Sequence, residues 1–213
     1  MKTEFNISDL LNIDRIKSGE FRDVVPELYN LNTVLENNPW HNSESVFDHT
    51  LKVCTSLFNI VGGLSAQQKT YLDGKIDRLN KREILSLAVV FHDLGKKETL
   101  INEGNFARCP GHEAAAENIV RDIIVRLMLS SKDGDRLLRI VLNHGLIHKI
   151  IDRDDSKYNI SIERMAIDHT DIYFDLILLG YADTKTSYLA TTNPEEYKLR
   201  IDRYKNLINN FII

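Results

Sequence analysis

Apolar residues recur at intervals of three and four along almost the whole chain, which is the spacing of one face of an α-helix. The strongest stretch, residues 81–94, is apolar on nearly every face, so we expect it to form a buried central helix. Alternation with a period of two, which marks a half-buried strand, is hard to find. The sequence therefore predicts an all-α fold.

Glycine, proline and capping residues divide this pattern into separate helices. We expect a short helix that ends near Gly19 and a loop at residues 37–42, where Asn, Pro and Trp interrupt the periodicity. A glycine pair at residues 62–63 ends a long helix that begins after Ser43 or Ser45. The other expected helices cover residues 21–35, 65–79, 81–94, 110–129, from 133 or 135 to 144, 160–167, 171–189 and 193–211.

A length of 213 residues suffices for one sizeable hydrophobic core without cross-links. No repeat and no linker-like segment divides the chain, so we expect residues 1–20 to form a helical extension and residues 21–213 to form a single helical bundle. The longest apolar run is too short to span a bilayer, and the first residues lack the apolar core of a secretory signal. Two cysteines without a C-x-x-C pair indicate reduced thiols and a cytoplasmic location.

The charge balance restricts the partners. With 27 basic and 31 acidic residues, the chain has a formal net charge of −4 and lacks the positive footprint that extended nucleic-acid binding requires. A local basic pocket could still take a small phosphorylated substrate or a nucleic-acid end. We expect no membrane partner, and the sequence does not indicate an oligomeric state.

Six histidine and aspartate residues lie within or at the ends of the expected helices. Their spacing matches no local metal-binding motif, so they can meet only through helix packing, and facing helices do build metal sites inside bundles. Any one of them alone is more often a hydrogen-bonded core residue, but six together favour a metal centre. They are His49, His92, Asp93, His112, His144 and Asp183.

The adjacent pair His92-Asp93 restricts the geometry further. Consecutive helical side chains point about 100° apart, so both can reach one ion only at a helix end or bend. Gly95 supplies such an end, and Lys96 then places an ammonium group beside the site. Imidazole and carboxylate together suit Zn²⁺, Mn²⁺ or iron, and a lysine in this position suits phosphate.

These residues resemble the motifs of the HD superfamily of metal-dependent phosphohydrolases, and most closely those of the HD domain attached to bacterial tRNA nucleotidyltransferases and poly(A) polymerase-like proteins. The resemblance covers residues 21–189, roughly. It is carried by Asn38-Pro39-Trp40-His41, Phe47-Asp48-His49-Thr50-Leu51, His92-Asp93-Leu94-Gly95-Lys96, the segment from Phe106 through Gly111-His112-Glu113-Ala114-Ala115, Leu142-Asn143-His144, and Asp183.

Several features of related classes are missing from the sequence. No Gly-Ser strand motif with paired aspartates precedes Phe21, so we expect a stand-alone HD protein rather than a tRNA nucleotidyltransferase. The paired Glu-Asp motif of alarmone hydrolases is not evident, and the Gly-Tyr-Pro signature of cyclic-di-GMP phosphodiesterases is absent. Both substrate classes are therefore less favoured.

The resemblance implies an HD-type helical bundle in which His49, His92, Asp93 and Asp183 hold a first divalent ion. His112 and His144 have the positions of additional ligands in two-metal members, with Asp93 as the bridge. The implied chemistry is attack on phosphorus by a metal-activated water, with Asp93 and Lys96 as the catalytic residues. One or two ions of Mn, Fe, Ni, Zn or Mg fit this scheme equally well.

Other polar residues near these motifs have two interpretations each. His41 and Arg108 are candidates for substrate binding, together with Lys96. A solvated loop residue is an equally good interpretation of His41, and for Arg108 it is the more common one. His148 lies one helical turn beyond His144, and we expect it to be a surface residue. His169 is expected to cap a helix or to lie on the surface.

The sequence thus predicts a metal-dependent phosphohydrolase, a phosphomonoesterase or phosphodiesterase, that acts on a nucleotide, a dinucleotide or a cyclic phosphodiester. A non-catalytic regulatory module that binds a nucleotide or an RNA end is the alternative from another class. A di-iron oxygenase is a third reading, against which Lys96 argues because its natural partner is phosphate.

Overall fold

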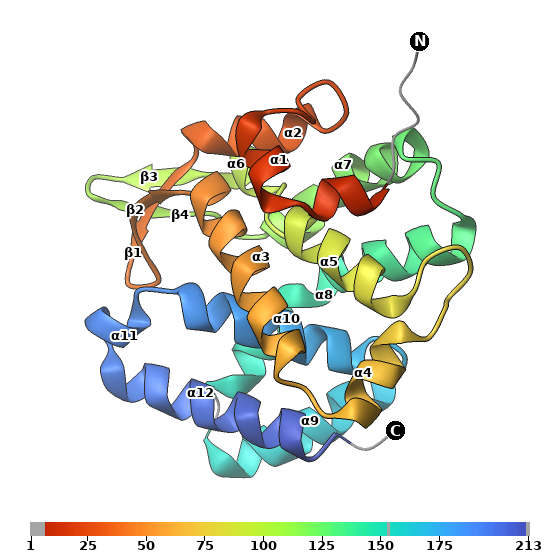
Figure 1. Ribbon diagram of the computed structural model, residues 1–213. Helices are drawn as coiled ribbons and strands as arrows, with labels where there is room; N and C mark the ends of the chain where they lie inside the picture. The colour runs from red at the N-terminus through yellow and green to blue at the C-terminus, as the bar shows by residue number, and fades with distance from the viewer. Residues whose placement is uncertain (1–6, 153, 212–213) are drawn as a thin grey trace.

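The computed structural model describes residues 7–152 and 154–211, and these residues are predominantly helical, as expected (Figure 1). Two short 3₁₀ helices lie at Ile7–Leu11 and Leu31–Thr33. The α-helices are α1 (Ile13–Ser18), α2 (Pro26–Asn30), α3 (Val46–Gly62), α4 (Ala66–Asp73), α5 (Lys81–Phe91), α6 (Lys96–Thr99), α7 (His112–Arg126), α8 (Ser131–Ile151), α9 (Asp155–Asp168), α10 (Tyr173–Thr186), α11 (Leu189–Thr192) and α12 (Pro194–Asn209).

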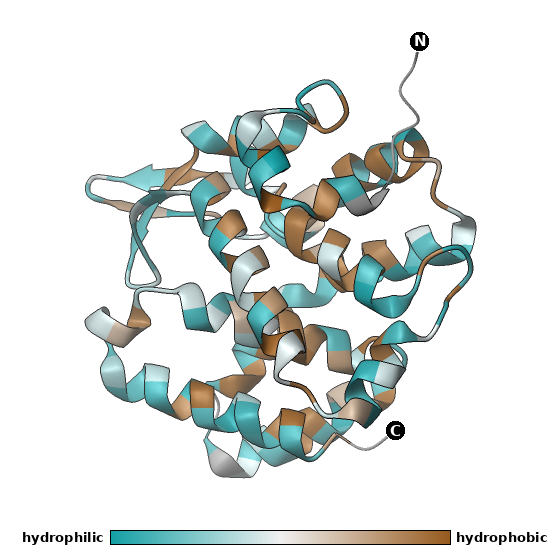
Figure 2. Ribbon diagram, in the orientation of Figure 1, coloured by the Kyte–Doolittle hydropathy of each residue, from teal (hydrophilic) through white to brown (hydrophobic). Residues whose placement is uncertain are grey.

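Helix α5 lies at the centre of the bundle, which confirms the expectation from its uniformly apolar sequence. It packs against α3 and α8, while α10 packs against α3, α8 and α12. Every residue from Leu87 to Phe91 is at most 2% exposed. Figure 2 shows hydrophobic segments on α3, α5 and α10 where these helices meet. The buried cluster runs from Leu10 to Ile208, so the core uses both ends of the described chain.

Two small antiparallel sheets correct the all-α prediction. Strand β1 (Leu35–Asn38) pairs with β2 (His41–Ser45), and β3 (Ile101–Glu103) pairs with β4 (Phe106–Arg108). The first pair replaces the loop expected at residues 37–42. Asn38 stabilises the turn, because its Oδ1 accepts from the backbone N–H groups of Trp40 and His41. Its Nδ2 donates to the carbonyl of Ala107 in β4, which holds the first hairpin against the second.

Two expected helices are shorter in the structure than their periodicity suggests. The helix expected at residues 21–35 covers only α2 and the following 3₁₀ turn, because the chain enters β1 at Leu35. The polar helix expected at residues 65–79 ends at Asp73. Beyond it, the buried carboxylate of Asp133 accepts from the backbone N–H groups of residues 77, 78 and 79 and holds this segment in a non-helical turn.

The N-terminal segment is part of the same packing. Leu10 and Ile16 are at most 1% exposed and belong to the common buried cluster. A domain boundary at residue 20 therefore stays a prediction. Among the described residues, no helix is long and apolar enough to cross a bilayer.

Candidate metal centre

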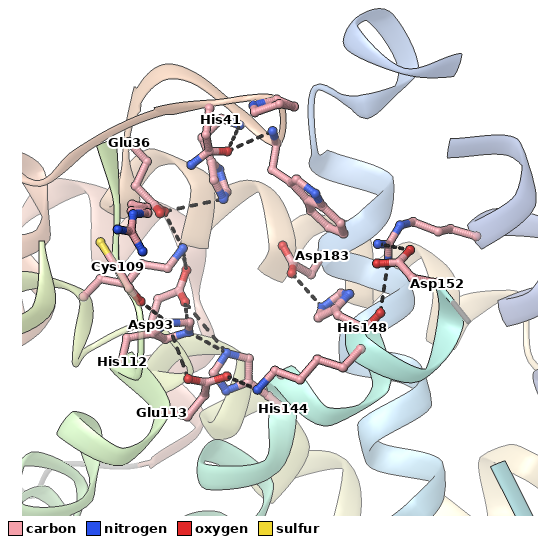
Figure 3. Close-up of a pocket in the computed structure, with 18 of the residues that line it drawn as sticks. Glu36, His41, Asp93, Cys109, His112, Glu113, His144, His148, Asp152 and Asp183 are labelled. Atoms are coloured by element: carbon pink, nitrogen blue, oxygen red, sulfur yellow. Dashed lines mark hydrogen bonds and ion pairs between the residues drawn. The ribbon is translucent and has the colours of Figure 1, made fainter. Parts of the chain in front are cut away.

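The six predicted ligands converge at one side of the bundle. Asp93, His112, His144 and Asp183 line a pocket of about 440 Å³ (Figure 3), and His49 and His92 lie beneath it with 1% exposure each. They come from α3, from the turn between α5 and α6, and from α7, α8 and α10. His92 and Asp93 occupy that turn, where the helix end allows both side chains to reach the same point.

The six predicted ligands form two groups of three, and a third group of potential ligands, His41, Glu44 and His49, adjoins them among the described residues. The ligand atoms of His49, His92 and Asp183 lie within 4.8 Å of one another, and those of Asp93, His112 and His144 do so as well. His49 Nε2 is 2.7 Å from Asp183 Oδ1, and His112 Nε2 is 3.4 Å from Asp93 Oδ1. The groups meet at the adjacent pair, where His92 Nε2 is 3.1 Å from Asp93 Oδ2. Each group could hold an ion, and the contact between His92 and Asp93 joins the two groups.

Three of the histidines are fixed in the same way. In each ring, Nδ1 faces the carbonyl oxygen of the residue three positions earlier. The distance is 2.7 Å for His92, 2.9 Å for His112 and 2.6 Å for His144. A carbonyl can only accept, so each Nδ1 carries a proton, and the neutral form of each ring presents the lone pair of Nε2 to the centre. The backbone thereby selects the tautomer that binds metal.

The proton count at this point is compatible with a bound cation. His112 Nε2 and His144 Nε2 are only 3.0 Å apart, although both Nδ1 atoms already hold protons. Burial, reinforced by His112 and His92, lowers the pKa of His144 well below its usual value, so a proton is a poor occupant there. His92 Nε2 and Asp93 Oδ2 are buried and make no hydrogen bond, although Asp93 Oδ2 forms an ion pair with the Lys96 ammonium at 3.0 Å. A divalent transition metal fits this set of nitrogen and carboxylate donors.

The pKa shifts of His49 and Asp93 also bear on the charge at this centre. Burial would lower the pKa of His49, but the contacts with Asp183 and Glu44 outweigh it and raise the pKa to about 9. Burial would raise the pKa of Asp93, yet the charges of His92 and Lys96 hold it well below the usual range. The surroundings of His49 and of Asp93 therefore favour positive charge at the centre, as a proton or as a metal ion.

Two glycines make the convergence possible. A Cβ at Gly95 would lie 2.1 Å from the carbonyl oxygen of His112 and 2.7 Å from the backbone nitrogen of Ala116, so only glycine lets the α5–α6 turn approach α7 this closely. Gly111 has φ +74°, in the left-handed region, and turns the chain into α7 at His112. These residues bring Asp93 and His112 together.

Lys96 lies beside the centre but is already paired. Its Nζ is 3.0 Å from Asp93 Oδ2 and 2.5 Å from Glu36 Oε2, and the residue is 6% exposed. Burial would lower the pKa of Lys96, but Asp93 and Glu36 raise it, so the ammonium stays charged. The predicted role in phosphate binding must therefore work through an ammonium shared with two carboxylates.

The β1–β2 hairpin supplies acidic residues that sequence reasoning missed. Glu36 lies on β1, and Glu44 on β2 places Oε1 3.4 Å from His49 Nδ1. Between them, His41 is 7% exposed, with Nε2 3.5 Å from Glu36 Oε2 and its ring edge-on to that of His49. Nothing in the sequence pattern marks these two glutamates, because their role depends on how the hairpin packs.

The outer part of the pocket contains the remaining candidates. His148 was expected on the surface, and that prediction is wrong: it lines the pocket, with Nε2 3.0 Å from Asp183 Oδ2. Its spacing of one helical turn from His144 was the available signal.

Two further candidates lie away from the ligands. Arg108 lines the pocket, half-exposed and 3.0 Å from Glu103. His169 caps α9, as expected.

Comparison of the sequence with protein-family models and with curated proteins finds no match. The assignment of a function therefore depends on the residues and their geometry.

Proposed function

We propose that the protein is an HD-type metal-dependent phosphohydrolase that acts on a small phosphorylated substrate or a nucleic-acid end. The supporting observation is the convergence of four imidazoles and two carboxylates, three of the imidazoles having their protons fixed on the far side of the ring. When bound, one or two divalent ions would supply a water of lowered pKa and stabilise charge on the phosphoryl oxygens.

The protein's own residues would provide the binding site. His49, His92 and Asp183 would hold one ion, Asp93, His112 and His144 the other, and the carboxylate of Asp93 would orient both. The Lys96 ammonium, 3.0 Å from Asp93 Oδ2, would then compensate negative charge close to the metal ligands. Arg108 and Lys149 on the rim add positive charge at the entrance.

The size of the pocket favours a small substrate over a polymer. About 440 Å³ suits a ligand the size of one nucleotide, and the net charge of −4 argues against extended nucleic-acid binding. The substrate class is thus a nucleotide, a dinucleotide, a cyclic phosphodiester or a single end of a polynucleotide.

The test is a panel of phosphomonoesters and phosphodiesters assayed with protein that has been stripped of metal and reloaded with Mn²⁺, Fe²⁺, Ni²⁺, Zn²⁺ or Mg²⁺. Turnover that depends on metal and is lost in Asp93→Asn is expected. Asp48→Asn is the matched control, because Asp48 is exposed on the first turn of α3 and bonds only to Ser45 at the helix cap. Binding of nucleotides without turnover by any metal form would instead favour the regulatory module.

One observation favours a second candidate, a di-iron oxygenase. Lys96 argues for phosphate at the sequence level, but Glu36 and Asp93 already balance its charge. Oxygen consumption by the iron-loaded protein, measured in the absence of phosphoesters, separates this candidate from the hydrolase.

A further inference from the structure

The C-terminal helix α12 lies outside the part of the chain that carries the HD resemblance, yet it reaches the candidate centre. Tyr204 of α12 is 0% exposed, and its hydroxyl oxygen is 3.2 Å from Nδ1 of His148. On the other side of the same ring, Nε2 is 3.0 Å from Asp183 Oδ2. A continuous path of polar contacts therefore runs from α12 to one of the candidate ligands.

The chemistry of the groups indicates where the proton of His148 lies. Nε2 makes no hydrogen bond in this geometry, but its neighbour at 3.0 Å is a carboxylate oxygen of Asp183, which can only accept and therefore favours the proton on Nε2. In a neutral ring, Nδ1 is then an acceptor, and the hydroxyl of Tyr204 is its donor. This tautomer is the opposite of that in His92, His112 and His144, whose Nδ1 atoms donate. His148 is therefore suited to orient the candidate metal ligand Asp183 rather than to bind a metal ion itself.

The surroundings fix this arrangement. A Cβ at Gly180 would lie 2.6 Å from the Tyr204 hydroxyl oxygen, so the space that the hydroxyl needs exists only because residue 180 is glycine. Trp40 packs edge-on against the His148 ring with centroids 5.2 Å apart. Arg200, also on α12, lies 4.5 Å from the Trp40 ring and donates to the carbonyl of His148 at 3.4 Å.

We propose that Tyr204 is a positioning residue that acts through His148 to orient the carboxylate of Asp183, so that α12 completes the metal centre. This inference rests on the proposed metal-dependent function. Tyr204 fixes the tautomer of His148, His148 occupies Oδ2 of Asp183, and Oδ1 is left to face His49. Partners of this kind, one step behind a metal ligand, commonly set metal affinity.

The first experiment reads the tautomer directly and needs no metal. Long-range ¹H–¹⁵N NMR of the metal-free protein at about pH 8, where a histidine with an ordinary pKa is neutral, assigns the protonated nitrogen of each ring. We expect the proton of His148 on Nε2, and a mixture of tautomers in Tyr204→Phe, which removes only the hydroxyl. A proton on Nδ1 of His148 in the wild type would overturn the inference.

The second experiment measures metal affinity by competition with a chromophoric chelator, in the absence of substrate. His148→Leu removes the donor to Asp183 and should weaken binding by about 10–100-fold. His148→Gln can still present an N–H near the position of Nε2 and should recover part of that loss. Tyr204→Phe acts one residue further away and should weaken binding by about tenfold or less.

Tyr181→Phe is the matched control, because it removes a phenol hydroxyl from a ring on α10 that packs against Tyr204. Unchanged metal affinity in both His148→Leu and Tyr204→Phe, with both variants folded, would refute the positioning role. A rise in KM alone would identify His148 as a substrate contact and refute it equally. If the wild type binds no metal, the proposed function fails, while the tautomer experiment still decides the contact between Tyr204 and His148.

Discussion

Two clusters of charged side chains in this protein differ in how their charges are balanced. In the first, Arg136 on α8 pairs with Asp175 on α10 inside the core. Nearby at the surface, Arg139 pairs with Asp171, just before α10, through two hydrogen bonds of 2.6 and 2.8 Å. Each carboxylate there has its own guanidinium group, although Arg136 Nε and Asp175 Oδ1 make no hydrogen bond. A cluster of this kind balances its charge without any ligand.

The second cluster, at the candidate metal centre, contains more negative than positive charge. Asp93 and Glu36 share the ammonium of Lys96, while Asp183 is in contact with the imidazoles of His49 and His148. Of these imidazoles, His49 has a pKa raised to about 9, so even with His49 protonated the three carboxylates exceed the two cations. Arg136 and Asp175 are as buried as the residues of the candidate metal centre, so burial alone does not distinguish the two clusters. The balance of charge does, and it is this balance that favours a cation at the candidate metal centre.

The largest expected effect is the loss of metal from Asp93→Ala. Asp93 lies near both groups of ligands, so elemental analysis should find at least one transition metal per wild-type chain and essentially none in the variant. Arg136→Met, which changes the balanced cluster, should retain the wild-type amount. Equal metal content in Asp93→Ala and the wild type would remove the distinction between the clusters.

A smaller loss is expected from His144→Ala, which affects one group of ligands only. Because His49, His92 and Asp183 remain, the variant should keep one ion and lose the other. Metal titration gives the stoichiometry, and anomalous diffraction locates the remaining ion. If the stoichiometry does not change, the protein holds a single ion and His144 serves the substrate or the core.

The balanced cluster should respond in stability rather than in metal content. Arg136→Met leaves the carboxylate of Asp175 buried and unpaired, which should lower the free energy of unfolding by about 3–5 kcal/mol. The double variant Arg136→Met/Asp175→Leu should recover much of this loss, because it removes both charges. Denaturant unfolding measures both, and a single variant as stable as the wild type would contradict the pairing.

The same variant should show a defined pH dependence. Burial, only partly opposed by Arg136 and Lys81, raises the pKa of Asp175 to about 7. The folded state then binds a proton that the unfolded state releases above about pH 4, so this residue lowers stability as the pH rises through that window. Without Arg136 the pKa of Asp175 rises further, so the pH range over which stability falls extends to higher pH. The loss of stability in the variant should therefore be greater at about pH 8 than at about pH 5.

The smallest of these effects concerns Lys96 and phosphoryl chemistry. Lys96→Met should lower kcat for phosphoester hydrolysis by about 10²–10³-fold, as for the loss of one preorganised charge at a reacting centre. Because Glu36 and Asp93 lose their common partner, the variant should also be less stable. Lys96→Met/Glu36→Gln removes that imbalance as a control, and turnover equal to the wild type in a metal-loaded double variant would exclude a role for Lys96 in hydrolysis.

Helical periodicity predicts most of the helices. The meeting of the six ligands is implied by the resemblance to the HD motifs, together with the end of one buried helix at Gly95. Glu36 and Glu44 were not predictable, since β1 and β2 have little strand preference and form where Asn38 bonds to β4. His148 could have been predicted from its spacing to His144. Tyr204 could not, because no local pattern relates α12 to a centre built from distant helices.

The contact between His49 and Asp183 spans 134 positions of the chain. It has a consequence for unfolding, because any partly open form that releases α3 or α10 separates these two side chains. A bound ion therefore favours only the fully assembled bundle, by about 2.7 kcal/mol when the free metal is at a hundredfold excess over its Kd. A bound metal ion would thus stabilise the bundle as a whole, and its removal would lower Tm across the whole bundle rather than loosen the site alone.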